Sequence, residues 1–111
     1  MEIPKNVREQ LDKIYEAPDN MDYIIDYKGR YLPKKGNALR ARHYHHIDID
    51  RDNNELWNLV PISYQDHIVG IHSKNNPLIK QDIYNFMIER YPEHEEHYRY
   101  YLLEEHNKFY E

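Results

Sequence analysis

The stretch that decides the fold lies between residues 43 and 72, where the chain reads HYHHIDIDRDNNELWNLVPISYQDHIVGIH. Residues 42–47 predict a short strand, and residues 58–62 predict a second one. The intervening residues 48–55 are too polar to form a packed element, so we expect a loop there. Pro61 cannot donate a backbone hydrogen bond, which predicts that the second strand lies at a sheet edge.

A helix is expected directly after the second strand, over residues 64–72. Ser63 is the expected N-cap, and Asp66 places a negative charge in the first turn. A strand, a loop, a strand and a helix in this order can bring two groups of histidines together: His43, His45 and His46 before the loop, and His67 and His72 on the helix. Histidine binds divalent transition metals and is the side chain best suited to proton transfer near neutral pH.

This segment resembles the ββα-metal motif of the HNH endonuclease family. The resemblance is carried by His45–His46–Ile47–Asp48, Asn53–Asn54, Asn58–Leu59–Val60 and His67, in the order HHID, NN, NL and H. It covers residues 43–72, which is under a third of the chain. The family implies a ββα unit and the hydrolysis of phosphodiester bonds with a single metal ion.

The resemblance implies a role for each matching residue. His46 would be the general base that activates water, and His45 and His67 would bind one divalent ion, either Mg²⁺, Mn²⁺, Ni²⁺ or Zn²⁺. The ion would stabilise the phosphorane and the departing 3′ oxygen, leaving 5′-phosphate and 3′-hydroxyl ends. Asn58 would have a mainly structural role, holding the loop that orients His46. Asp48 would either assist the metal or, as we favour, cap the loop.

His72 is a further candidate metal ligand, but its spacing departs from the HxxxH pattern of many histidine-rich members. It lies five positions after His67, a spacing that on a regular α-helix turns the two side chains about 140° apart. The ion could be bound by His45 and His67 with water or Asp48. Alternatively, a π turn of about 4.4 residues near Gly70 would align the two histidines. The helix could also end at Gly70.

Several nearby residues have simpler interpretations. Asn53 and Asn54 are expected to be turn formers. His43 shares a strand face with His45, so it either supports the metal site or phosphate, or is a surface side chain. Trp57 is expected to anchor the core. Farther along the chain, the histidines of His94–His97 are expected to be exposed on an acidic helix.

The charge distribution points in two directions. The formal net charge of −5, from 15 basic and 20 acidic residues, argues against a nucleic-acid partner. Residues 28–79, however, carry a net charge of +3, from eight basic and five acidic residues. Within them lies a run of six cations with no carboxylate between them, which we take as candidate DNA-binding residues with a solvated loop as the alternative: Lys28, Arg30, Lys34, Lys35, Arg40 and Arg42.

The remaining chain predicts a helix over residues 5–16, a hairpin over 23–32, a helix over 78–90 and a last helix from Pro92. Tyr98, Tyr101, Leu102 and Phe109 would share one face of that last helix. The 111 residues fit one small α+β domain over 1–111, with its motif core at 43–72 and a helical extension at 78–110. Without cysteine or a membrane-spanning apolar run, we expect a cytoplasmic protein, in a bacterial host if the chain is phage-encoded.

Two functions compete at this point. The first is a metal-dependent endonuclease acting on DNA. The second is a non-catalytic binding protein on the same scaffold, for example a phage-encoded inhibitor of a host enzyme. Its protein partner would dock on the acidic C-terminal helices, since the two ends of the chain carry 15 of the 20 carboxylates. A structural zinc module is a third possibility, but it needs four good ligands.

Overall fold

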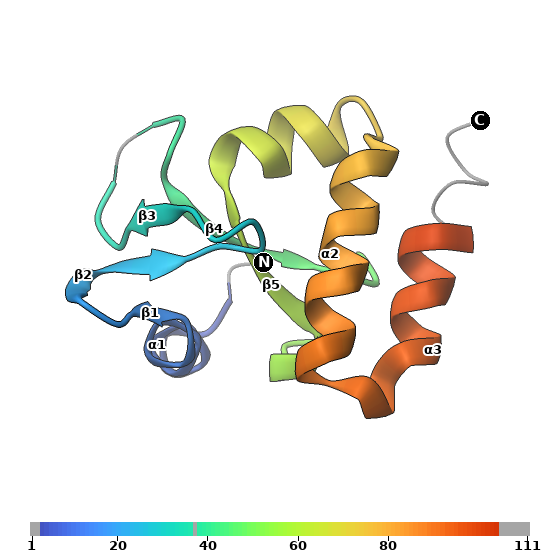
Figure 1. Ribbon diagram of the computed structural model, residues 1–111, viewed down its shortest axis with the longest axis horizontal. Coiled ribbons are helices and arrows are strands. Elements are labelled where there is room, and N and C mark those ends of the chain that lie inside the picture. The colour runs from blue at the N-terminus through green and yellow to red at the C-terminus, as the bar shows by residue number, and fades with distance from the viewer. Residues whose placement is uncertain (1–2, 37, 105–111) are drawn as a thin grey trace.

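The computed structural model describes residues 3–36 and 38–104 and confirms a small α+β domain (Figure 1). The N-terminal elements are α1 (Lys5–Ile14), β1 (Glu16–Ala17), β2 (Asn20–Ile25) and β3 (Tyr31–Pro33). The central elements are β4 (Arg42–His46), η1 (Leu56–Asn58), β5 (Leu59–Ser63) and η2 (Gln65–His72). The C-terminal helices are α2 (Pro77–Arg90), η3 (Pro92–His94), α3 (Glu95–Tyr98) and η4 (Arg99–Glu104). The prediction for Phe109, like the end of the 78–110 extension, lies outside the described residues.

The N-terminal part forms an antiparallel sheet in the order β1-β2-β3. The predicted hairpin is confirmed as β2 and β3, and its turn contains Gly29 at a φ of 78°, a conformation that favours glycine. The short strand β1 was not predicted, because two residues carry no readable periodicity. It follows α1 directly and pairs with β2.

The predicted pair of strands is confirmed as an antiparallel ladder between β4 and β5. Its register runs from Arg42 opposite Ser63 to His46 opposite Leu59. As expected for a strand that contains Pro61, β5 pairs only with β4 among residues 3–36 and 38–104. On the other side of β5, the Pro61 carbonyl accepts one hydrogen bond, from the Tyr27 backbone N–H at 3.2 Å.

The predicted helix after β5 is present, but η2 is wound as a π-helix. At its start the Ser63 hydroxyl accepts the Asp66 backbone N–H at 3.1 Å, as predicted for a capping serine. At its end the Ser73 hydroxyl donates to the Ile68 carbonyl, five residues back, at 2.8 Å. A Cβ at Gly70 would lie 2.6 Å from the Ile79 side chain, so the glycine allows η2 to approach α2 closely.

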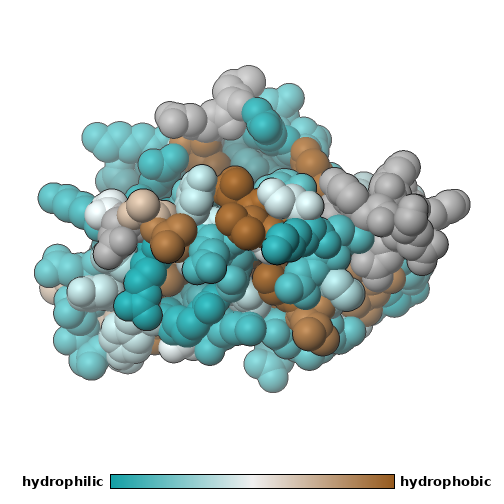
Figure 2. Space-filling view, turned by 90° about the horizontal axis from the view of Figure 1, so that it is seen from above, coloured by the Kyte–Doolittle hydropathy of each residue, from teal (hydrophilic) through white to brown (hydrophobic). Residues whose placement is uncertain are grey.

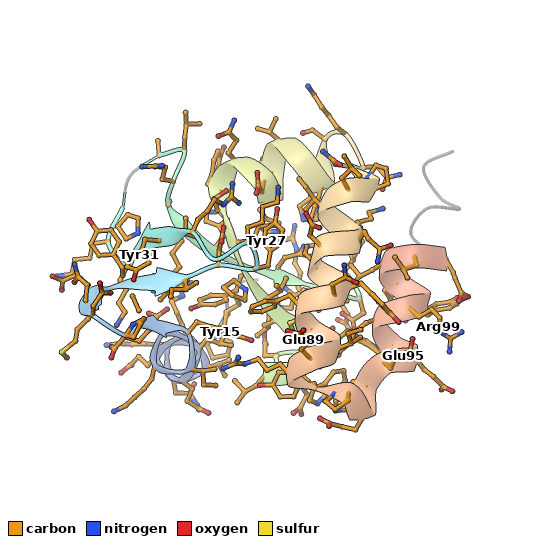
Figure 3. All side chains as sticks on the ribbon, in the orientation of Figure 1. Tyr15, Tyr27, Tyr31, Glu89, Glu95 and Arg99 are labelled. Carbon is orange, nitrogen blue, oxygen red and sulfur yellow. The ribbon has the colours of Figure 1, made fainter. Side chains whose placement is uncertain are left out.

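The β4–β5 ladder lies between two groups of buried side chains, and all five residues of β5 are buried. Leu59 packs with α1 and the N-terminal sheet, whereas Val60 and Ile62 pack with η2 and the C-terminal helices. Figure 3 shows Tyr15 and Tyr27 directed into the interior, where the Tyr15 ring lies 5.9 Å from that of Phe86 on α2. The β4–β5 ladder therefore contributes buried side chains to both groups, one on each of its faces.

Helix α2 begins at the predicted point, with Asn76 as its N-cap and Pro77 in its first turn. The Asn76 side chain accepts the backbone N–H groups of Leu78 and Ile79. The helix expected from Pro92 is broken into η3, α3 and η4, which lie beside α2 in Figure 1. The face shown in Figure 2 is mostly hydrophilic with small hydrophobic patches, and no helix among the described residues has the length and apolar character of a membrane span.

Candidate metal centre

Three histidine side chains meet between the β4–β5 ladder and η2, and we call His45, His67 and His72 the histidine cluster. His45 comes from β4 and is buried, His67 is half-buried on η2, and His72 is exposed at the end of η2. One ring nitrogen of each residue lies within 4.8 Å of the other two. The Nε2 atoms of His67 and His72 are 2.9 Å apart. Convergent imidazole nitrogens of this kind can bind a transition-metal ion.

The π-helical winding of η2 is what brings His67 and His72 together. On an α-helix a five-residue separation would turn their side chains about 140° apart. On a π-helix the same separation is little more than one turn, so both rings project to the same side. Of the three arrangements considered for this spacing, the structure contains the π-helical one.

His43 contacts the cluster through the far side of the His67 ring. The Nδ1 atoms of the two rings are 3.1 Å apart, so the Nδ1–H of His67 can donate to His43 while its Nε2 faces the cluster. Partners of this kind fix the orientation of a ligand ring. Burial, helped by the charges of His72, His43 and His46, lowers the pKa of His67 to about 3. The ring is therefore neutral at physiological pH, which is the form that binds metal.

His46, the expected general base, is half-buried at the end of β4. Its Nε2 atom is 2.9 Å from Oδ1 of Asn54. A neutral His46 that donates through Nε2–H keeps its Nδ1 atom as a proton acceptor. Asn54 was predicted only as a turn former, and no sequence signal distinguished this contact from an ordinary turn.

Asn58 is fully buried and holds the loop between the two strands closed. Its amide nitrogen donates to the Asp48 carboxylate and to the Asn53 carbonyl, both at 2.9 Å. Its Oδ1 atom accepts the Asp48 backbone N–H at 3.3 Å. The Asp48 carboxylate also accepts the Asn53 side chain at 2.7 Å, so it is turned into the loop and does not belong to the histidine cluster. These contacts fit the structural role expected for Asn58.

The C-terminal helices also reach this loop, which was not foreseen. Nε2 of His97 lies 2.8 Å from Oδ1 of Asn58. The His94 ring stacks on Trp57 with a centroid distance of 4.0 Å, and the Tyr98 hydroxyl donates to the Trp57 carbonyl at 2.6 Å. The expectation that these histidines are exposed is therefore wrong, since both are half-buried.

Four of the six cations between residues 28 and 42 are paired with carboxylates. The pairs are Lys28–Asp82, Arg30–Asp26, Arg30–Asp66, Lys34–Glu16 and Arg42–Asp12. Lys35 and Arg40 are exposed and form no ion pair within the described residues. DNA contact by the six cations stays a prediction, and Arg42 is the member of the run that borders the histidine region.

Two clefts of about 450 and 440 Å³ lie beside the histidine cluster. His46, Arg51 and His67 line both of them. The first cleft is also lined by Arg8 and Arg42, and the second by His45 and His72. Sequence reasoning missed Arg8, because nothing in the sequence indicates that α1 lies against β4. Arg51 lies within the motif, but its sequence neighbours are acidic, so the sequence did not indicate an anion-binding role for it.

The histidine cluster suits some metal ions better than others. Imidazole nitrogens are good ligands for Zn²⁺, Ni²⁺ and related ions, whereas Mg²⁺ prefers oxygen. Three protein ligands leave at least one coordination position for water or substrate, as in catalytic rather than structural zinc sites. The donor set therefore fits a transition-metal ion with an open position.

Comparison with known proteins adds no assignment to this site. No family model, curated protein or solved structure matches the chain. The resemblance to the HNH family is confined to the sequence of residues 43–72, so the function is inferred from the chemistry of the residues gathered around the histidine cluster.

Proposed function

We propose that the protein is a metal-dependent endonuclease that hydrolyses phosphodiester bonds in DNA. The observation that carries this proposal is the convergence of His45, His67 and His72 from two elements beside His46. The five-residue spacing of the two helical histidines satisfies this geometry only through the π-helical winding of η2. The sequence motif and the local geometry thus point to the same chemistry.

The histidine cluster would bind one divalent ion, with Zn²⁺ or Ni²⁺ preferred by its donor set. Bound there, the ion would supply a Lewis acid for the phosphoryl oxygens and the leaving group. Of this chain's own residues, His43 would keep the His67 ring oriented through the Nδ1 contact of 3.1 Å. His45, buried on β4, would supply the most rigid ligand.

His46 would act as the general base. Its Nδ1 atom would take a proton from the attacking water, while Asn54 holds Nε2–H at 2.9 Å. The water oxygen forms the new bond to phosphorus, and the bond from phosphorus to the 3′ oxygen breaks. The departing 3′ oxygen takes a proton from solvent. Asn58 would not touch the substrate but would hold the loop that carries Asn54.

Metal binding is tested separately from cleavage. Co²⁺ titration, followed by visible absorption, should reveal one site in the wild-type protein and none in His67→Ala. His94→Gln is the matched control, because His94 stacks on Trp57 away from the cluster. Equal Co²⁺ binding by wild type and His67→Ala would remove the basis of the proposal.

Cleavage is tested on supercoiled plasmid with Zn²⁺, Ni²⁺, Mn²⁺ or Mg²⁺, beside an EDTA control. The wild type should convert the plasmid only when metal is present, and His46→Ala should lose at least about a hundredfold in rate. His46→Ala should still bind Co²⁺. Cleavage that survives both EDTA and His46→Ala would show that the activity belongs to a contaminant or to another base.

The binding-protein alternative has its own support in the ion pairs that neutralise much of the basic run. A folded, Co²⁺-loaded protein that cleaves no DNA with any of the four metals would favour it. Its partner would then be sought with the acidic C-terminal helices as the docking surface.

A further inference from the structure

The two clefts beside the histidine cluster are basic, although the chain as a whole is acidic. The formal net charge is −5, yet three arginines line the first cleft: Arg8, Arg42 and Arg51. No carboxylate of the described residues lines either cleft. A cleft lined by charge of one sign concentrates ligands of the opposite sign. The expected ligand is therefore an anion.

Two of these arginines keep their full capacity to bind an anion. Arg42 is paired with Asp12, whereas neither Arg8 nor Arg51 forms an ion pair or side-chain hydrogen bond within the described residues. Arg51 has a carboxylate on either side in the sequence, but it pairs with neither Asp50 nor Asp52, and Asp50 instead accepts the backbone N–H of Asp52 at 2.9 Å. The planar guanidinium matches the oxygens of a phosphate with two parallel donors.

The shared lining of the clefts places these arginines next to the proposed metal. His46, Arg51 and His67 line both clefts, so a chain that fills one passes directly into the other. Arg8 and Arg42 lie on one side of these shared residues, and His45 and His72 lie on the other. An extended polyanion can therefore occupy the arginine side while one of its phosphates lies at the histidine cluster.

We infer that Arg8 and Arg51 bind the DNA phosphate next to the one at the histidine cluster, and that they, rather than the run from Lys28 to Arg42, are the main substrate-binding cations. The position of the cut rests on the proposed function, whereas phosphate binding by the two arginines does not. Arg8 on α1 thereby makes the N-terminal helix part of the substrate site.

The test is DNA binding without metal. Fluorescence anisotropy of a short labelled DNA duplex is measured over a series of KCl concentrations. EDTA is present throughout, so that the proposed metal-dependent cleavage cannot occur. The double variant R8Q/R51Q is compared with K35Q/R40Q. The second variant also removes two positive charges, but from exposed cations of the run between Lys28 and Arg42. Circular dichroism and thermal unfolding confirm that both variants are folded.

In R8Q/R51Q the slope of log affinity against log salt should shrink by about 0.9, because the two arginines bind one phosphate and each phosphate that is no longer neutralised removes about 0.9. At low salt its affinity should fall at least about tenfold, and K35Q/R40Q should stay within about twofold of wild type. Equal losses in the two variants would overturn the inference, since DNA would then respond only to total charge. A wild-type protein with no measurable salt-dependent DNA binding would overturn it as well.

These outcomes are distinguishable from those of the cleavage test. The metal-site variant His67→Ala should bind the duplex in EDTA as wild type does, although it cannot cleave. Salt-dependent binding through Arg8 and Arg51 with no cleavage under any metal would keep this inference and remove the nuclease. Cleavage with normal binding in R8Q/R51Q would keep the nuclease and remove this inference.

Discussion

Asn58 is a fully buried amide that links three parts of the chain. Its nitrogen donates to Asp48 and to the Asn53 carbonyl, and its oxygen lies within hydrogen-bond distance of His97. Because both atoms of the amide are used, the side chain can be neither shortened nor charged without leaving buried polar groups unpaired. The residue therefore stabilises the loop between the strands whether or not the protein cleaves DNA.

The substitution Asn58→Asp should strongly destabilise the fold. It has nearly the same shape but replaces the two donated hydrogen bonds with a carboxylate beside that of Asp48. We expect the free energy of unfolding to fall by about 3 kcal/mol or more, since a buried charge is left without compensation. Urea denaturation measures the change. Asn85→Asp on the exposed side of α2 should cost less than about 0.5 kcal/mol, and an equal cost at both sites would contradict the central role of Asn58.

The low pKa of His67 makes the stability of the metal-free protein depend on pH. In the unfolded chain the ring has an ordinary pKa near 6.5, whereas in the fold the pKa is about 3. Between these values the unfolded state binds the additional proton, so the free energy of unfolding decreases as the pH falls below about 6.5. Burial also lowers the pKa values of His43 and His72, which act in the same direction.

We expect this loss to approach about 1.4 kcal/mol per pH unit for His67 about one pH unit or more below 6.5, where the unfolded ring is almost fully protonated and the folded ring is still neutral. Urea denaturation in EDTA, at a series of pH values above and below 6.5, measures this change in the free energy of unfolding. His67→Gln should show a weaker pH dependence than the wild type. A wild-type stability that does not change over this range would show that the cluster does not stay neutral in the fold.

At the scale of a single element, η2 meets a requirement that an α-helix could not meet. Its five-residue spacing must bring His67 and His72 to one side. The wider turn of the π-helix achieves this, although this type of helix is rare and usually short. Removal of one residue between the two histidines would restore a four-residue spacing, which an α-helix can align.

Deletion of Val69 tests this interpretation, because Val69 is exposed and belongs to neither group of buried side chains. We expect the shortened protein to wind this segment as an α-helix and to retain Co²⁺ binding within about tenfold of wild type, because the two histidines of the helix remain on one side. Val69→Ala controls for the loss of the side chain alone. If the deletion abolishes Co²⁺ binding in a folded protein while Val69→Ala preserves it, the alignment depends on the π-helix itself.

The sequence predicted the elements of the site better than their winding. The hydrophobic periods and the signals at Ser63, Asn76 and Pro77 are local, and the strands and helix starts that depend on them are confirmed. The π-helix was one of three open arrangements, because the spacing of two histidines does not decide how the backbone satisfies it. Asn54 was missed as the partner of His46, since an asparagine that forms a turn has the same local pattern.

At the scale of the whole molecule, contacts between distant segments decide the charge of the site. Arg42 pairs with Asp12 and Arg30 with Asp66, over separations that no local pattern reveals. These ion pairs neutralise cations whose partners cannot be recognised in the sequence. The packing of α1 places Arg8 in the lining of the first cleft instead. The fold class was predictable because it depends on local elements, whereas the set of cations that line the clefts was not.

The C-terminal helices are tied to the loop of the site through His97, and this contact can be tested. His97→Leu removes the donor to Asn58 and should lower the free energy of unfolding by about 1–3 kcal/mol. His97→Gln retains a donor and should recover part of that loss. Under the proposed function, His97→Leu should also lower plasmid cleavage while Co²⁺ binding is unchanged. Equal stability of the two variants would show that the contact contributes nothing.

The position of the β4–β5 ladder between two groups of buried side chains has a consequence for amide hydrogen exchange. Backbone groups in the most buried elements open only with the whole fold, whereas exposed elements open locally. The fully buried β5 should therefore exchange slowly in both the metal-free and the metal-loaded protein. η2, which carries two of the three histidines of the cluster and ends in the exposed His72, should exchange faster without metal and slow down when metal is added. If added metal slows exchange on η2 and not on β5, the ion stabilises η2 against local opening, whereas β5 is held in place by the fold itself.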